Sequence, residues 1–222
     1  MMVDFSPIFS RYETLVAEAD ALFTHVRSTH QDCVTCHQGC SDCCHALFDL
    51  SLVEAMYLNA AFTETFAYGK ERSDILLKAA DIDRQTTRIK RELYRASKAG
   101  ENADEILRRA AAARVPCPLL DAQNTCLLYA QRPITCRLYG IPTAFGGKGH
   151  VCGKTTFAKG GAYPTVNMDK IQNQLAGLSQ DIASAAHSRF SELHQVYVPV
   201  SMALTTKYND DYLGIGPVKK ED

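Results

Sequence analysis

Five cysteines fall between positions 33 and 44 of this chain, and four more follow at wider spacing between positions 117 and 152. The first group is Cys33, Cys36, Cys40, Cys43 and Cys44, and the second is Cys117, Cys126, Cys136 and Cys152. With 222 residues and 46% apolar side chains, the chain is long enough to build a hydrophobic core without them. The hydrophobic core therefore does not explain the nine cysteines, and they require another explanation.

The compartment decides how these thiols are interpreted. The first seven residues carry neither the basic nor the apolar region of a secretory signal, and no window approaches the roughly 18 apolar residues of a transmembrane helix. We therefore expect a cytoplasmic protein, where structural disulfides are disfavoured. An odd number of cysteines also fits poorly with complete pairing, so the pattern favours metal ligands or redox groups over disulfides.

Charge gives little indication of a macromolecular partner. The formal net charge of −1 provides no electrostatic reason to expect binding to nucleic acid or to an anionic membrane. The basic residues between Lys90 and Arg114 alternate with acidic ones, which is typical of a solvated helix face. Nothing in the sequence identifies a protein partner or an oligomeric state.

The periodicity of apolar residues predicts a mainly α fold. A helix opens at Ser6-Pro7 and presents an apolar face, and it ends near Thr29–Asp32. A second begins at Ser51, with Glu54 completing a capping box. Residues 71–114 predict two more helices, broken near Gly100. The apolar face of the first helix is predicted to comprise Ile8, Tyr12, Leu15, Ala19, Leu22 and Val26.

Beyond Pro116 the chain is irregular before it becomes helical again. Residues 119–129 predict a small β-hairpin around the turn at 121–125, and Pro133 a short helix through Cys136. Gly146–Gly149 reads as a turn, since it lacks the spacing of a phosphate-binding loop. A long amphipathic helix is predicted from Asn167 through Val196, with a short one after Pro199. We expect a single domain, 1–222, whose helical bundle supports a cysteine-rich irregular region.

The spacing of the first cysteines suits a metal centre. Thiolates are soft anionic ligands for zinc and iron–sulfur centres, and the two-residue spacer from Cys40 to Cys43 can place both sulfurs on one ion. The side chains of adjacent Cys43 and Cys44 diverge, which suits ligands to different irons of a cluster, or a ligand beside a non-ligand, better than a plain zinc knuckle. Cys44 and Cys117 lie 73 positions apart. Closing that loop costs about 4 kcal/mol, less than the roughly 10–16 kcal/mol that structural zinc provides in peptides.

Four ordered blocks of sequence resemble the YkgJ-type cysteine-cluster family, a proposed zinc- or iron-chelating domain. They run Cys36-x3-Cys40-x2-Cys43-Cys44, then Cys117-Pro118-x-Leu120, then Cys126-x2-Tyr129-x2-Arg132-Pro133-x2-Cys136-Arg137-x-Tyr139, and finally Cys152-Gly153. The resemblance spans residues 36–153 and leaves zinc or iron open. It implies a metal-binding region with eight metal ligands and leaves Cys33 outside the pattern: the ligands are Cys36, Cys40, Cys43, Cys44, Cys117, Cys126, Cys136 and Cys152.

A similar cysteine cluster occurs in flagellin lysine methylases, which resemble iron–sulfur enzymes that use S-adenosylmethionine. This second likeness implies a methyltransferase-type alternative, which a failure to bind S-adenosylmethionine in calorimetry would count against. Whether the chain is an enzyme is left open, because no catalytic residue can be assigned from the sequence.

Several residues beside the cysteines have two interpretations. Arg132 and Arg137 are assigned to cofactor binding, through the negative charge of a thiolate-ligated centre; the alternative is an ion pair or backbone clamp that fixes the turn. Tyr129 and Tyr139 are interpreted as packing residues. The histidines adjacent to cysteines are interpreted as exposed or supporting residues, not ligands: His37, His45 and His150.

The sequence therefore predicts a metal-binding protein that holds an iron–sulfur cluster through cysteines of two distant segments. The alternative cofactor is a zinc ion in a structural or carrier module. Eight thiolates exceed the four that one zinc ion or one common cluster requires. Either two centres form, or some cysteines are spectators or resolving thiols.

Overall fold

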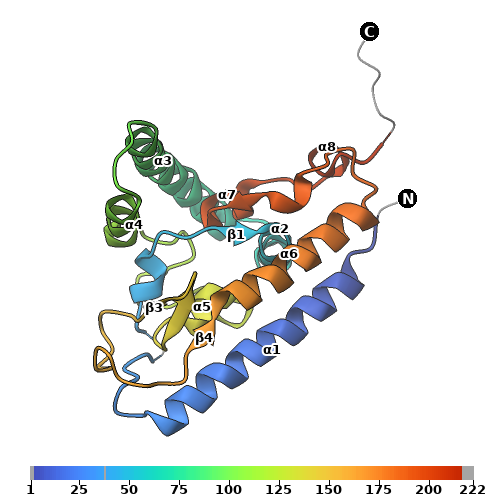
Figure 1. Cartoon of the computed structure of the whole chain (residues 1–222). Helices are drawn as coiled ribbons and strands as arrows, with labels where there is room; N and C mark the ends of the chain where they lie inside the picture. Colours follow the sequence, from blue (N-terminus) through green and yellow to red (C-terminus); the bar gives the residue numbers. More distant parts are fainter. Residues whose placement is uncertain (1–2, 38, 217–222) are drawn as a thin grey trace.

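The computed structural model describes residues 3–37 and 39–216 and confirms a mainly α fold (Figure 1). The helices of this part of the chain are α1 (Ser6–Thr29), α2 (Leu52–Thr65), α3 (Lys70–Lys98), α4 (Ala103–Ala112), α5 (Ile134–Leu138), α6 (Met168–Ala185), α7 (Val200–Thr205) and α8 (Asp210–Leu213). Single 3-10 turns are η1 (Asp42–His45), η2 (Tyr129–Gln131) and η3 (Leu193–Gln195). The strands are β1 (Leu50–Ser51), β2 (Thr143–Phe145), β3 (Lys148–His150), β4 (Val166–Asn167) and β5 (Tyr197–Val198).

The strands form two small sheets. β1 pairs antiparallel with β5, with Leu50 opposite Val198. β2 pairs antiparallel with β3 and parallel with β4, so the hairpin of the fold turns at Gly146 and Gly147. The predicted hairpin at residues 119–129 is reduced to one isolated bridge between Leu120 and Cys126.

Helix α2 is the centre of the fold, and its first two turns, residues 52–58, are buried on nearly all sides. Leu52, Val53 and Met56 pack into a core shared with α1, α5 and α6, where α1 and α6 run side by side (Figure 1). Leu58 and Phe62 face a second core, against α3, α7 and residues 117–128. A helix that is apolar all round lies inside a protein, as α2 does here. The two cores therefore share one helix as their common wall.

The capping box predicted at Ser51 is present, and its carboxylate has a second function. Glu54 accepts hydrogen bonds from the backbone N–H and hydroxyl of Ser51, at 3.1 and 2.8 Å. Its other oxygen accepts from the backbone N–H of Ile134, at 3.2 Å. Glu54 is fully buried, and burial raises the pKa of its carboxyl. One side chain thus joins the first turn of α2 to the first turn of α5.

Two details of the helix predictions are wrong. Leu22 is exposed, because Phe23 packs against the core at that point of α1. The long helix α6 ends at Ala185, so Val196 is not part of it. The chain leaves α6 through a Schellman motif, in which His187 has a φ of 45° and the N–H of Ser188 bonds to the carbonyl of Ala183 at 3.0 Å.

Across residues 3–37 and 39–216, none of the helices combines the length and apolarity that crossing a lipid bilayer requires.

Candidate metal centre

Backbone hydrogen bonds join the two cysteine segments directly. The backbone N–H of Cys117 donates to the carbonyl of Cys44 at 2.6 Å, and that of Val115 donates to the carbonyl of His45 at 3.1 Å. An antiparallel bridge between Ala46 and Arg114 continues this pairing. The end of η1 and the segment after α4 therefore lie side by side, although about 70 residues separate them in the sequence.

A tight turn carries Cys126 back toward Cys117. The carboxylate of Asp121 accepts backbone N–H groups of Gln123 and Thr125, at 2.9 and 2.7 Å. The N–H of Leu127 then donates to the carbonyl of Leu119 at 2.8 Å. An aspartate that bonds to backbone two residues on is a common way to close a turn. The turn at 121–125 was predicted. It reverses the chain, so that Cys126 pairs with Leu120 in one isolated bridge.

Helix α5 carries Cys136, and buried polar groups hold this helix in place. Glu54 caps its first turn through Ile134. Arg137, buried in the same helix, donates to the carboxylate of Asp20 in α1 at 2.6 Å and to the backbone carbonyls of Arg132 and Ala130. These bonds fix α5, and with it Cys136, between α1 and α2.

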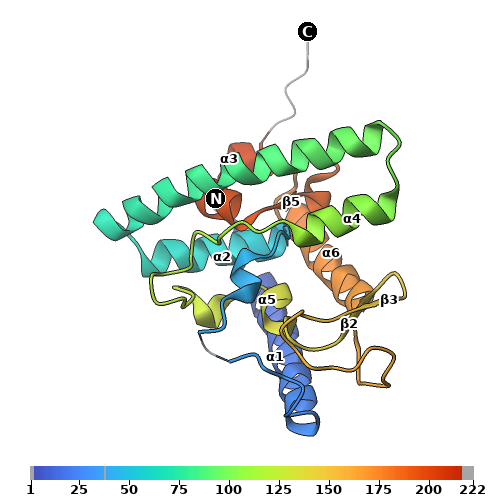
Figure 2. The same ribbon diagram turned by 90° about the vertical axis from the view of Figure 1, so that its left-hand side faces the viewer.

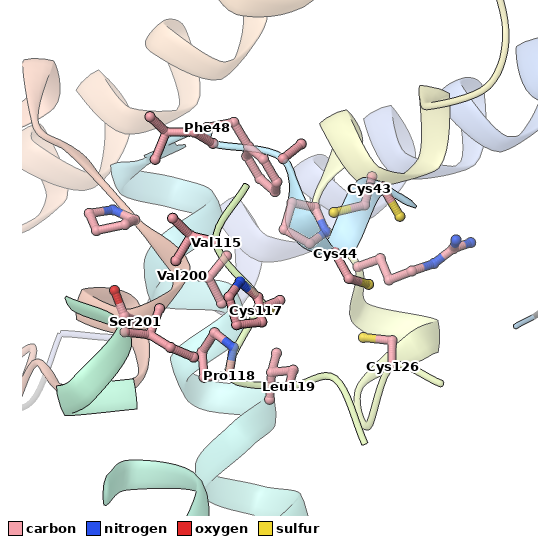
Figure 3. Close-up of a pocket in the computed structure, with 18 of the residues that line it drawn as sticks. Cys43, Cys44, Phe48, Val115, Cys117, Pro118, Leu119, Cys126, Val200 and Ser201 are labelled. Carbon is pink, nitrogen blue, oxygen red and sulfur yellow. The ribbon is translucent and has the colours of Figure 1, made fainter. Parts of the chain in front are cut away.

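The result is a small pocket with thiols from both segments on its walls. We call it the thiol pocket; its cysteines are Cys43, Cys44, Cys117, Cys126 and Cys136. In Figure 3 the side chains of Cys43, Cys44 and Cys126 lie on one side and Val200 and Ser201 on the other. Its free volume is about 60 Å³. Apolar residues make up most of the remaining wall, and of the five cysteines Cys43 is buried while the other four are partly exposed.

The thiols of the pocket titrate very differently from one another. Hydrogen bonds shared with Cys136 and Cys44 lower the pKa of Cys43 to about 3. The same hydrogen bonds raise the pKa values of Cys44 and Cys136. Burial raises the pKa of Cys117 to about 12. Because thiolates are the form that binds metal, metal binding must release the proton of every ligand sulfur that is still a thiol.

Arg132 is the cation beside these sulfurs. Burial raises the pKa of Cys126, and the charge of Arg132, which also lines the thiol pocket, opposes that rise. Its guanidinium lies 3.6 Å from the ring centroid of Tyr129 and donates to the carbonyl of that residue at 2.9 Å. Arg137 is not among the residues that line the thiol pocket, and its bonds match the backbone-clamp alternative.

Three of the eight predicted ligands lie outside the thiol pocket. Cys152 donates its thiol to the carboxylate of Asp42 at 3.4 Å, on the other side of η1. Burial raises the pKa of Cys36 to about 11, with the neighbouring charge of Cys40 as the next cause. Cys36 also packs against Gly140, just beyond α5. Cys36, Cys40 and Cys152 thus form a looser group beside the thiol pocket.

The contact of Cys36 with Gly140 predicts a sensitive position. Gly140 has a φ of 101°, and a Cβ there would lie 2.8 Å from the Cβ of Cys36. We expect Gly140→Ala to lower the free energy of unfolding by about 2 kcal/mol, measured by urea denaturation, because both backbone and neighbour resist the methyl group. Gly149→Ala is the matched control: a Cβ there meets no atom within 4 Å, so a change within about 0.5 kcal/mol is expected. Equal losses in the two variants would refute the close contact.

The histidines beside the cysteines bond to backbone carbonyls or are exposed, whereas Tyr129, interpreted as a packing residue, is 41% exposed with Arg132 over its ring. His37 and His45 each bond through Nδ1 to a backbone carbonyl, of Thr35 at 2.8 Å and of Ser41 at 2.9 Å, and His150 is exposed. The hydroxyl of Tyr139 donates to Asp42 at 3.0 Å. Sequence reasoning missed Asp42, a buried carboxylate next to Cys43; only its position inside the cysteine run could have drawn attention to it.

The five cysteines of the thiol pocket do not form a closed ligand shell. All nine cysteines of the chain are free thiols. Within the described ranges, 3–37 and 39–216, no three His, Cys, Asp or Glu side chains lie close enough together to hold a metal ion. The thiols of the pocket fit a thiophilic metal. To bind one, the cysteine side chains would have to bring their sulfurs closer together.

Comparison with known proteins bears on this arrangement. The profile of the CxxCxxCC family, described as a "putative zinc- or iron-chelating domain", matches residues 32–153, which is more than half of the chain. The chain belongs to this family. The match contains every residue of the thiol pocket that carries sulfur, and it supports metal chelation with zinc or iron as the metal. No curated protein and no solved structure matches the chain.

Proposed function

We propose that this CxxCxxCC protein binds an iron–sulfur cluster in the thiol pocket, through cysteines of both segments. One observation supports the proposal most: consecutive Cys43 and Cys44 share a pocket with Cys117, Cys126 and Cys136. Four thiolates hold a common cluster, so the pocket offers enough ligands and one to spare. Arg132 beside the sulfurs would compensate the negative charge of a thiolate-ligated centre. When bound, a cluster of this kind supplies electron transfer.

The remaining predicted ligands need a separate role. Cys36, Cys40 and Cys152 do not line the thiol pocket, so they would hold a second centre or serve as spectators. A second centre would draw on these three sulfurs and on Asp42, which already contacts Cys152. The ratio of metal to protein distinguishes the two alternatives, because a second centre raises it while spectators leave it unchanged.

Zinc is the second candidate, and the size of the pocket favours it. A free volume of about 60 Å³ is small, which suits a single ion without inorganic sulfide. Zinc in a site with four protein ligands supplies no redox chemistry and acts as a structural tie. It would hold residues 115–165 on the helices.

Anaerobic purification separates these candidates. We expect brown protein with visible absorption that bleaches on reduction, and iron and acid-labile sulfide in stoichiometric amounts by elemental analysis. Colourless protein with stoichiometric zinc would replace the cluster by the zinc alternative. Protein without either metal after anaerobic purification and reconstitution would contradict both.

A further inference from the structure

A second, larger cavity adjoins the thiol pocket across η1. Asp42 lines this cavity, whereas the next residue, Cys43, lines the thiol pocket. The cavity volume is about 640 Å³, within the range of 300–1,000 Å³ that is usual for small-molecule sites. Its walls come from the end of α4, from α5, from the β2–β3 hairpin and from the start of α6, which lie around one region in Figure 2.

Polar bonds hold these walls together. The ammonium group of Lys148 in β3 pairs with the carboxylate of Asp104 in α4 at 2.7 Å. The backbone N–H of Gly146, at the tip of the hairpin, donates to Asp169 in α6 at 2.9 Å. The β2–β3 hairpin is therefore bonded to both α4 and α6, which come from different parts of the chain.

The charged groups of the cavity favour an anion. Two cations, Arg114 and Lys154, face one carboxylate, Asp42. The carboxylate is already satisfied, because it accepts from Arg114 at 2.8 Å and from Tyr139 at 3.0 Å, with the thiol of Cys152 at 3.4 Å. The ammonium group of Lys154 stays 3.8 Å from it. Both cationic side chains keep about half of their surface exposed, 48% for Arg114 and 57% for Lys154.

The rest of the lining suits an organic molecule. Leu138, Ile141, Val151 and Met168 provide apolar contact area within the same cavity. Sites for small molecules combine mostly apolar walls with a few polar groups that fix orientation. An arginine held by a carboxylate on one side retains donors for a bidentate bond to a carboxylate or phosphate on the other.

We propose that this cavity binds a small organic anion, whose carboxylate or phosphate group pairs with Arg114 and Lys154 beside the metal centre. This site goes beyond metal binding, and its ligand would lie against Cys152 and the η1 turn that carries Cys43. The cations recognise the charged group, and the apolar wall receives the remainder of the molecule. Asp42 holds Arg114 in position and does not itself contact the anion.

Two matched pairs of probes test the proposal on metal-loaded protein by calorimetry. Adenosine 5′-monophosphate is compared with adenosine, and succinate with succinamide, so that each pair differs in its anionic groups. We expect at least one anion to bind at least tenfold more tightly than its neutral counterpart. Preference for the first pair assigns the site to phosphates, and preference for the second assigns it to carboxylates. If neither anion binds more tightly than its neutral counterpart, the proposal is wrong.

Variants locate the binding. Arg114→Gln and Lys154→Gln should each weaken binding of the preferred anion at least tenfold, the latter without disturbing the short bonds to Asp42. Arg109→Gln is the control, since Arg109 of α4 pairs with Glu101, just before that helix, and does not line the cavity; this variant should bind like the wild type. Metal content is measured on the same samples, so loss of the metal centre is distinguished from loss of anion binding. Equal affinity in all variants would overturn the assignment to this cavity.

Discussion

Replacing Cys43 with serine is expected to abolish metal binding and to destabilise the metal-loaded protein by about 4 kcal/mol or more. Cys43 lies in η1, lines the thiol pocket and is the buried one of its five cysteines, with a pKa lowered to about 3. A metal at 1,000 times its dissociation constant stabilises the folded state by about 4 kcal/mol, and this contribution disappears with the ligand. Elemental analysis and thermal unfolding of Cys43→Ser, prepared anaerobically, measure both effects.

Cys33→Ser provides the control for this prediction. Cys33→Ser makes the same cysteine-to-serine change in the same segment, but Cys33 does not line the thiol pocket. Metal content and the midpoint of unfolding should match those of the wild type. If Cys43→Ser instead keeps its full metal content and an unchanged midpoint, Cys43 is not a ligand.

The second large effect is expected at Arg137. Arg137→Met leaves the backbone carbonyls of Arg132 and Ala130 without their donors and separates α5 from Asp20 in α1. Its side chain is only 7% exposed, so the lost bonds are not replaced by water. We expect the free energy of unfolding to fall by about 3 kcal/mol, measured by denaturant titration.

A surface pair in the same protein calibrates this value. Arg11 pairs with Asp181 at the same distance of 2.6 Å, but its side chain is 64% exposed, so Arg11→Met should cost less than about 1 kcal/mol. Performing both titrations on metal-free protein separates the two interpretations of Arg137. A backbone clamp predicts the loss without metal. A residue that serves only to stabilise a charged cofactor predicts no loss until metal is bound.

The parts of the fold that were predicted correctly depend on local rules. Ser51 and Glu54 cap α2 within three residues, Pro133 precedes α5, and Gly100 separates α3 from α4. The end of α6 could not be predicted, because its terminating left-handed residue is His187 where glycine is usual. A histidine in that conformation leaves no mark in the apolar periodicity, which continues to Val196.

The candidate site was predicted in its chemistry but not in its grouping. Cysteine spacing and the family pattern identify the candidate metal ligands. They do not separate the five cysteines of the thiol pocket from Cys36, Cys40 and Cys152. That separation depends on the bridge between Ala46 and Arg114 and on the position of α5, which are long-range contacts. Asp42 and Glu54 were missed as members of the site for the same reason, since their partners lie at least 70 residues away.

Anomalous scattering from crystals of the anaerobically purified protein tests the central claim most directly. Data collected on both sides of the iron and zinc absorption edges locate the metal and identify it. The account predicts a peak in the thiol pocket at about 2.3 Å, a thiolate–metal bond length, from the sulfurs of Cys43 or Cys44 and of at least one of Cys117, Cys126 and Cys136. A metal bound by cysteines of one segment alone, or a peak outside this pocket only, would contradict it.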